Sequence, residues 1–152
     1  MKRILLSLLL TAVLALSSCG SSPKNEISRA LELDLSQGTV LHQEDTHSGL
    51  QGDGIGCIVL SFPDGQLEEQ LNARTDWNPL PMDPTAATLA SEAYLVRADG
   101  SPLLPNIQAG YYRLMDRQSD RSEPMLDRWS LNFTLAVYDA EAHTLYYCTM
   151  DT

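Results

Sequence analysis

The sequence predicts an α+β fold, a mainly antiparallel sheet of about five strands with two or three helices packed on it. Apolar and polar residues alternate over residues 131–138, and a second such run follows a short polar turn, which is typical of a C-terminal β-hairpin. Residues 55–62 are apolar at nearly every position, as in a strand covered on both faces. Asp64, and Asp83 followed by Pro84, are typical helix starts.

The N-terminus has the features of a secretory leader. Lys2 and Arg3 precede the uncharged residues 4–16, a run too short to cross a bilayer, which takes roughly 20 apolar residues. Small residues then lead to Cys19. The run Leu16-Ser17-Ser18-Cys19 resembles the lipobox of bacterial lipoproteins, in which the cysteine sulfur receives a diacylglycerol carrying acyl chains such as palmitate. The alternatives are an ordinary cleaved signal peptide and a buried N-terminal helix.

The lipobox resemblance implies a domain organisation. We expect residues 1–18 to be a signal peptide, residues 19–24 a lipidated tether beginning at Cys19, and residues 25–152 a single α+β domain. The protein would then lie on the extracytoplasmic face of the cell membrane, attached through its lipid anchor.

The charge of the chain excludes one class of partner. Its formal net charge is −10, and loss of Lys2 and Arg3 with the leader would make it −12. Lys24 would be the only lysine left. Because nucleic-acid binding depends on lysine and arginine neutralising phosphates, we expect no nucleic-acid partner.

The first half of the domain should contain one short helix and two strands. Asn25 can cap a helix over residues 26–32. Residues 39–45 form a weak strand, and the glycine-rich residues 48–54 form a loop before the strand 55–62.

The middle of the chain should contain two more helices. Asp64 would begin one that ends near Arg74, and Asp83 would cap another over residues 84–93. Residues 77–81 contain two prolines and are expected to be irregular, not a ladder strand. The remaining expected elements are strands over residues 94–97 and 110–117 and a solvated excursion over residues 119–127.

The C-terminal hairpin has a preferred register. If Asp139 faces Thr144, then Leu135 pairs with Cys148, and both strands bury the same face, as in a sheet covered on one side. A slip of one residue would instead pair Leu135 with Tyr147 and lose only the last apolar pair, so the hairpin is better determined than its register.

Asp45 and His47 form the first candidate site, next to a glycine-rich loop that contains Asp53. Asp45 could orient His47 as a catalytic histidine is oriented, but no nucleophile is evident. His42 and Glu44 would lie on the other face of the strand, so no face offers the three ligands that catalytic zinc needs. We therefore interpret residues 45–54 as a binding loop pinned by side-chain hydrogen bonds, and expect no metal, cofactor or catalytic residue.

Cys57 and Cys148 are a candidate disulfide, which an extracytoplasmic location permits. Both lie in predicted strands, where unpaired cysteines are usually inert small apolar residues. The aromatic residues near the strands are expected to lie mostly in the core or in cross-strand pairs. They are Tyr111, Tyr112, Trp129, Tyr138, Tyr146 and Tyr147.

Several short motifs resemble those of a group of small, uncharacterised lipoproteins of Gram-positive gut-type bacteria. The resemblance covers most of the chain after the leader and implies lipidation and an envelope location, but it carries no known activity. The motifs are Asp45-Thr46-His47-Ser48-Gly49 with Gly52-Asp53-Gly54, Gly110-Tyr111-Tyr112, Asn132-Phe133-Thr134, and Thr144-Leu145-Tyr146-Tyr147-Cys148.

These observations lead to two functional hypotheses. The first is a non-catalytic envelope lipoprotein that binds an envelope protein or a cell-wall component through residues 45–54 and nearby aromatic residues. The alternative is a hydrolase or metal-dependent enzyme centred on Asp45 and His47. A nucleophile or two further ligands beside His47 would favour the enzyme.

Overall fold

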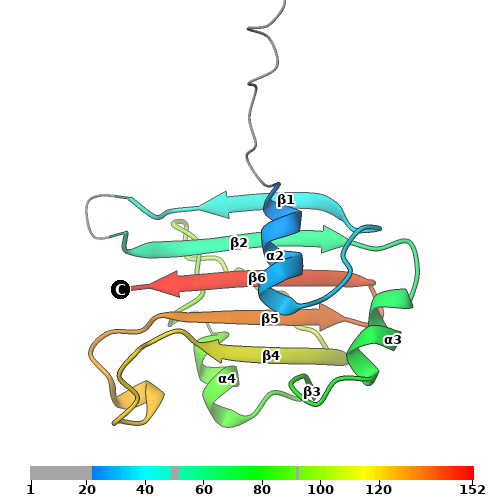
Figure 1. Ribbon diagram of the computed structural model, residues 1–152. Coiled ribbons are helices and arrows are strands. Elements are labelled where there is room, and N and C mark those ends of the chain that lie inside the picture. Colours follow the sequence, from blue (N-terminus) through cyan, green and yellow to red (C-terminus); the bar gives the residue numbers. More distant parts are fainter. Residues whose placement is uncertain (1–21, 49–51, 92) are drawn as a thin grey trace, which may run out of the picture.

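The computed structural model describes residues 22–48, 52–91 and 93–152 as a six-stranded antiparallel sheet with helices on both faces (Figure 1). The predicted α+β class is confirmed, with one strand more than expected. The strands lie in the order β1-β2-β6-β5-β4-β3. They are β1 (Thr39–Asp45), β2 (Gly54–Ser61), β3 (Asn78–Pro79), β4 (Gly110–Asp116), β5 (Phe133–Asp139) and β6 (Thr144–Asp151).

The sixth strand is β3, where the sequence predicted an irregular stretch. Asn78 pairs with Tyr112 and Pro79 with Tyr111. Proline cannot donate a ladder hydrogen bond, but it is tolerated in an edge strand, and β3 is the outermost strand beside β4. The prolines therefore limit this strand to two residues at the sheet edge without preventing it.

Three helices form near the predicted positions, and all three end early. The helix α2 (Pro23–Leu31) is capped by Ser22, not Asn25, because Pro23 occupies its first turn. It thus begins inside the stretch expected to be a tether. The other elements of this kind are α3 (Gln66–Asn72), α4 (Pro84–Leu89) and the short 3₁₀ helix η1 (Met125–Asp127). Asp83 caps α4 as predicted, whereas the N-cap of α3 is Gly65 and not Asp64. The predicted strand over residues 94–97 is reduced to one bridge between Val96 and Pro102.

The C-terminal hairpin has the preferred register. Asp139 faces Thr144, Val137 faces Tyr146 and Leu135 faces Cys148. In contrast to the expected one-sided burial, the residues of β5 are buried on both faces from Phe133 to Tyr138.

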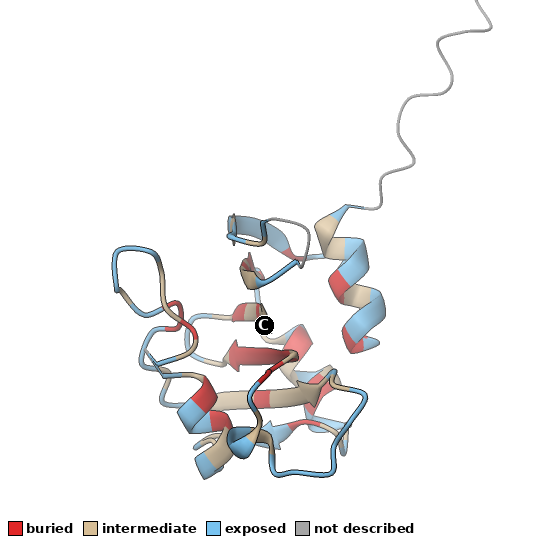
Figure 2. Ribbon diagram, turned by 90° about the vertical axis from the view of Figure 1, so that its left-hand side faces the viewer, coloured by how far each residue is buried: buried red, intermediate tan, exposed pale blue. Residues whose placement is uncertain are grey.

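Two apolar clusters, one on each face of the sheet, explain this burial. The first contains residues of α2 and α3 with alternate residues of the strands. The second contains residues of α4 and the loop that follows it. Viewed along the strands, α2 lies on one side of the sheet and irregular loops lie on the other, with buried segments between them (Figure 2). The sheet is therefore the middle of three layers.

Candidate functional site

One end of the sheet brings together polar residues from three chain segments. The strands β1, β4 and β6 end there, and β2 and β5 begin there (Figure 1). The candidate residues lie at this end: Asp45 is the last residue of β1, and His47 follows the strand. Cys19 and residues 49–51, part of the predicted loop, lie outside the described residues.

The Asp45 carboxylate holds His47 in two ways. Its Oδ1 accepts hydrogen bonds from the backbone N–H of His47 at 2.9 Å and from the ring Nδ1 at 2.5 Å. The backbone bond and the ring bond, in that order, lower the pKa of Asp45. The predicted pinning of a loop by Asp45 is therefore present in the structure.

Asp151, which the sequence did not single out, occupies the other side of the imidazole. Its Oδ2 lies 3.1 Å from Nε2 of His47. Partial burial alone would lower the pKa of His47, but the bonds to Asp45 and then Asp151 outweigh it and raise that pKa. The protonated ring, which donates from both nitrogens, is the form that this geometry favours.

Arg117 extends the array to β4 and β5. Its Nη2 donates to Asp151 at 2.9 Å and to the carbonyls of Phe133 and Met150 at 3.1 and 3.2 Å. The charges along Asp45, His47, Asp151 and Arg117 alternate in sign. We call these four residues the end clasp, because they join the ends of strands that are distant in sequence.

Glycines make room for the end clasp. A Cβ atom on Gly54 would lie 2.5 Å from the Cα and backbone N of His47. On Gly56 it would lie 2.9 Å from Oγ1 of Thr149 and 3.5 Å from Cε1 of His47. The predicted glycine-rich turn thus serves close backbone approach as well as chain reversal. By contrast, no hydrogen bond or ion pair joins the Asp53 carboxylate to the clasp among the described residues.

A small cavity of about 140 Å³ lies beside the end clasp. Asp45 and His47 form one side of it, and Ile58 and Tyr147, which face each other across β2 and β6, form part of another. Ile58 and Tyr147 also pack against the cluster that contains α2, so the cavity lies on the α2 face of the sheet. The structure therefore places a predicted aromatic residue next to the predicted loop.

The end clasp does not form a catalytic triad. Both nitrogens of His47 face carboxylates, so neither offers a lone pair to accept a proton from a nucleophile. Within residues 22–48, 52–91 and 93–152, no group of three or more His, Cys, Asp or Glu side chains could hold a metal ion. The arrangement suits a fixed hydrogen-bonding surface better than proton transfer.

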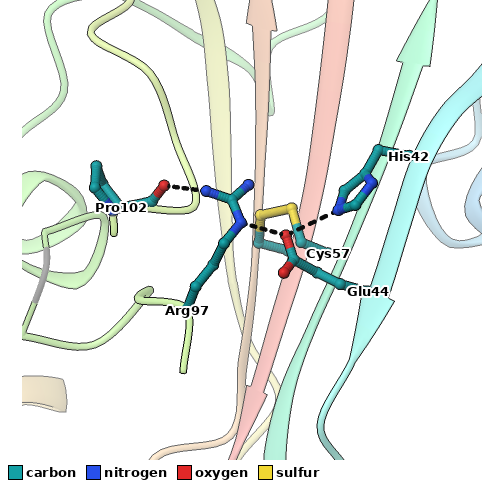
Figure 3. Close-up of a disulfide and its surroundings, with 6 residues drawn as sticks. His42, Glu44, Cys57, Arg97 and Pro102 are labelled. Carbon is teal, nitrogen blue, oxygen red and sulfur yellow. Dashed lines mark hydrogen bonds and ion pairs between the residues drawn. A yellow bond between two sulfur atoms is a disulfide. The ribbon is translucent and has the colours of Figure 1, made fainter. Parts of the chain in front are cut away.

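A second polar cluster lies next to the disulfide (Figure 3). Nε of Arg97 donates to Oε1 of Glu44 at 2.9 Å, and Nε2 of His42 lies 3.3 Å from the same oxygen. Nη1 of Arg97 donates to the carbonyl of Pro102 at 2.6 Å. His42 and Glu44 share a face of β1, as the strand period indicated. Arg97 therefore joins β1 to the loop after α4, which covers the second apolar cluster.

Cys57 and Cys148 are joined by a disulfide between β2 and β6 (Figure 3). They face each other in the ladder, and their Cα atoms are 4.1 Å apart. Both residues are buried, with 1% and 0% of their surface exposed. The sequence could name this pair as a candidate but could not establish that β2 lies beside β6.

No protein-family model, curated protein sequence or solved structure matches this chain.

Proposed function

We propose that the protein is a membrane-anchored extracytoplasmic lipoprotein whose domain is a non-catalytic binding module. The observation that carries this proposal is the disulfide between Cys57 and Cys148. Such bonds persist in oxidising compartments outside the cytoplasm. Of the three cysteines in the chain, Cys19 alone is then left with a thiol, in the lipobox-like sequence that lipidation requires.

The start of the domain suits an anchor at Cys19. A chain spans at most about 3.5 Å per residue, so the step from Cys19 to Pro23 covers at most about 14 Å. The helix α2 begins at the level of β1 and runs across the sheet toward β5 (Figure 1). An anchored domain would therefore have its β1 side close to the lipid surface. Among the described residues, no helix is long and apolar enough to cross a bilayer itself.

The end clasp supports binding in preference to catalysis. It fixes polar side chains around a cavity too small for most metabolites and leaves His47 without a free ring nitrogen. Fixed polar groups beside an aromatic side chain, here Tyr147, are typical of protein-recognition surfaces. We expect the partner to be an envelope protein or a cell-wall component that contacts this surface.

Lipidation is tested by growing cells with an alkyne-tagged fatty acid and separating membrane from soluble fractions. The wild type should incorporate the label and sediment with membranes, and Cys19→Ala should do neither. Mass spectrometry should find the mature N-terminus at Cys19 with a diacylglycerol adduct. Recovery of unlabelled wild-type protein with an intact leader from the cytosol would overturn the proposed location.

Binding is tested by cross-linking in intact cells, followed by purification of the protein with its captured partners. His47→Ala removes the centre of the end clasp, whereas His42→Ala removes an exposed histidine of β1 and is the matched control. We expect a partner captured by wild type and His42→Ala to be lost with His47→Ala. An identical set of partners for all three proteins would refute a binding role for this end of the sheet.

A further inference from the structure

Trp129 is the most exposed large apolar residue of the described chain, with 95% of its surface accessible. It lies in the segment that joins β4 to β5, drawn in yellow and orange at the lower left of Figure 1. Exposing a whole indole to water is unfavourable, since it removes one of the largest apolar side chains from the core. The sequence predicted that most of the aromatic residues near the strands lie in the core or in cross-strand pairs, and Trp129 does neither.

A polar pocket of about 250 Å³ adjoins this indole. No residue lines both this pocket and the cavity beside His47. The residues that line it are Gln118, Asp120, Ser122, Glu123, Arg128 and Trp129.

The walls of the pocket are held in place despite their irregular backbone. Nη1 of Arg128 donates to Asp116 at 2.8 Å, and its Nε donates to the carbonyl of Glu123 at 2.9 Å. Nη2 of Arg121 donates to the carbonyl of Asp116 at 2.7 Å, and the Asn132 amide donates to Gln118. These bonds fix the segment at both of its ends, so a ligand would meet a preorganised surface.

Several groups in the pocket remain available for a ligand. Among the described residues, the Glu123 carboxylate, the Gln118 amide nitrogen and Nη2 of Arg128 have no hydrogen-bond partner. The charge of Arg128 is already balanced by Asp116 at 2.8 Å. The pocket thus offers both donors and acceptors but no unpaired positive charge, which disfavours an anionic ligand.

We propose that Trp129 and this pocket bind a neutral oligosaccharide. One face of a pyranose ring carries aliphatic C–H groups that pack flat on an indole, and each sugar hydroxyl both donates and accepts a hydrogen bond. The mixed donors and acceptors beside Trp129 match such hydroxyls, whereas an ammonium group would need acceptors only. The segment also lies on the side of the sheet away from β1, where α2 begins (Figure 1).

The test is a calorimetric titration of the full-length protein, kept in a detergent without a sugar headgroup. The probes are tetramers of β-1,4-linked N-acetylglucosamine, β-1,4-linked glucose and α-1,4-linked glucose. We expect at least one of these tetramers to bind. In the same titration followed by fluorescence, binding should shift the Trp129 emission to shorter wavelength. Trp129→Ala should weaken binding by about tenfold, and Trp129→Phe should restore part of it. Leu126→Ala, which changes another exposed apolar residue of the same segment, should leave binding unchanged.

A parallel titration with tetramethylammonium and a lysine-rich peptide tests the cationic alternative. Glu123→Gln keeps a hydrogen-bond acceptor but removes the charge, so it should largely preserve saccharide binding and would weaken binding of a cation. Saccharide binding should also change little with salt. Failure of all three tetramers to bind, or salt-dependent binding of the cations alone, overturns the proposal. Neither result bears on lipidation or on the surface around His47.

Discussion

The properties of His47 come from two carboxylates that lie far apart in the sequence. Asp45 precedes it by two residues, and Asp151 follows it by more than a hundred. Neither carboxylate alone would fix both ring nitrogens. The histidine is therefore a charged connector between chain segments, and its protonation should affect stability.

Replacing His47 with Gln should lower the stability of the protein by an amount that depends on pH. The pKa of His47 is raised above its ordinary value of 6.5. Its charge-dependent stabilisation should therefore be fully present below that value and be lost as the pH rises through the raised one. Urea unfolding between about pH 5 and pH 9 should show a difference between wild type and variant that shrinks with increasing pH. A difference that stays constant would contradict the ionic role.

Gly54→Ala should disturb the end clasp without changing any of its members. The new Cβ atom would lie 2.5 Å from the backbone of His47, which must then move. We expect lower stability and a histidine pKa, followed by NMR, that returns toward its ordinary value. Gly65→Ala is the control, because its nearest neighbour would be 3.8 Å away. Equal effects of the two substitutions would argue against the close contact.

Among the helices and strands, a disulfide and a cluster of ion pairs connect elements that are distant in the sequence. The disulfide closes a separation of 91 residues between β2 and β6. In the ion cluster, Asp76 pairs with Arg74 at 2.8 Å and with Arg113 of β4 at 3.0 Å. Arg74, which follows α3, also donates to the carbonyl of Glu32, just after α2, so the cluster as a whole connects the ends of α2 and α3 to β4.

Replacing Cys57 and Cys148 together with Ala should lower the free energy of unfolding by about 2–4 kcal/mol, the usual value for a bond that closes a long loop. Chemical denaturation of the purified protein measures it. Because both cysteines are buried, a reductant should have little effect until the protein unfolds. Cys19→Ala is the control and should leave the unfolding curve unchanged. Equal stability of the double variant and wild type would contradict this role.

Asp76→Asn should destabilise the protein at neutral pH and have little effect in strong acid. Hydrogen bonds from Arg74, together with the charge of Arg113, lower the pKa of Asp76 to about 2. Its contribution is therefore present above the ordinary value of 3.8 and is lost as the pH falls through about 2. The carboxylate is 35% exposed, so solvent screening limits the expected effect to about 1 kcal/mol. Thermal unfolding from neutral to acid pH would show whether the difference disappears.

At the scale of the whole molecule, the proposed anchor and the proposed saccharide site lie on different sides. The β1 side would face the membrane, and the segment between β4 and β5 would face away from it (Figure 1). This arrangement would leave Trp129 free to contact a glycan while the lipid holds the domain at the surface.

Fluorescence quenching in liposomes checks this orientation. The emission of Trp129 is isolated by subtracting the spectrum of Trp129→Phe, since the other tryptophan, Trp77, is buried. Iodide in the aqueous phase should quench this emission strongly, and brominated lipids should not. Strong quenching by brominated lipids would instead place Trp129 at the bilayer.

Local residue patterns were enough to predict several elements of the fold. The alternation of residues predicted the hairpin of β5 and β6 and favoured the register that the structure has, although a slip would have lost only one apolar pair. Asp83 and Pro84 fixed the start of α4, and the carboxylate of Asp45 two residues before His47 predicted the pinned loop. Each of these depends on residues within a few positions of one another.

Only the tertiary structure decided what distant segments do to one another. It placed β2 beside β6, which brought Cys57 opposite Cys148 and Asp151 next to His47. It covered the second face of β5, and it left Trp129 in solvent. These outcomes depend on strand order and loop packing. Both follow from the burial of apolar area over the whole chain, so they leave no periodic signal in any one segment.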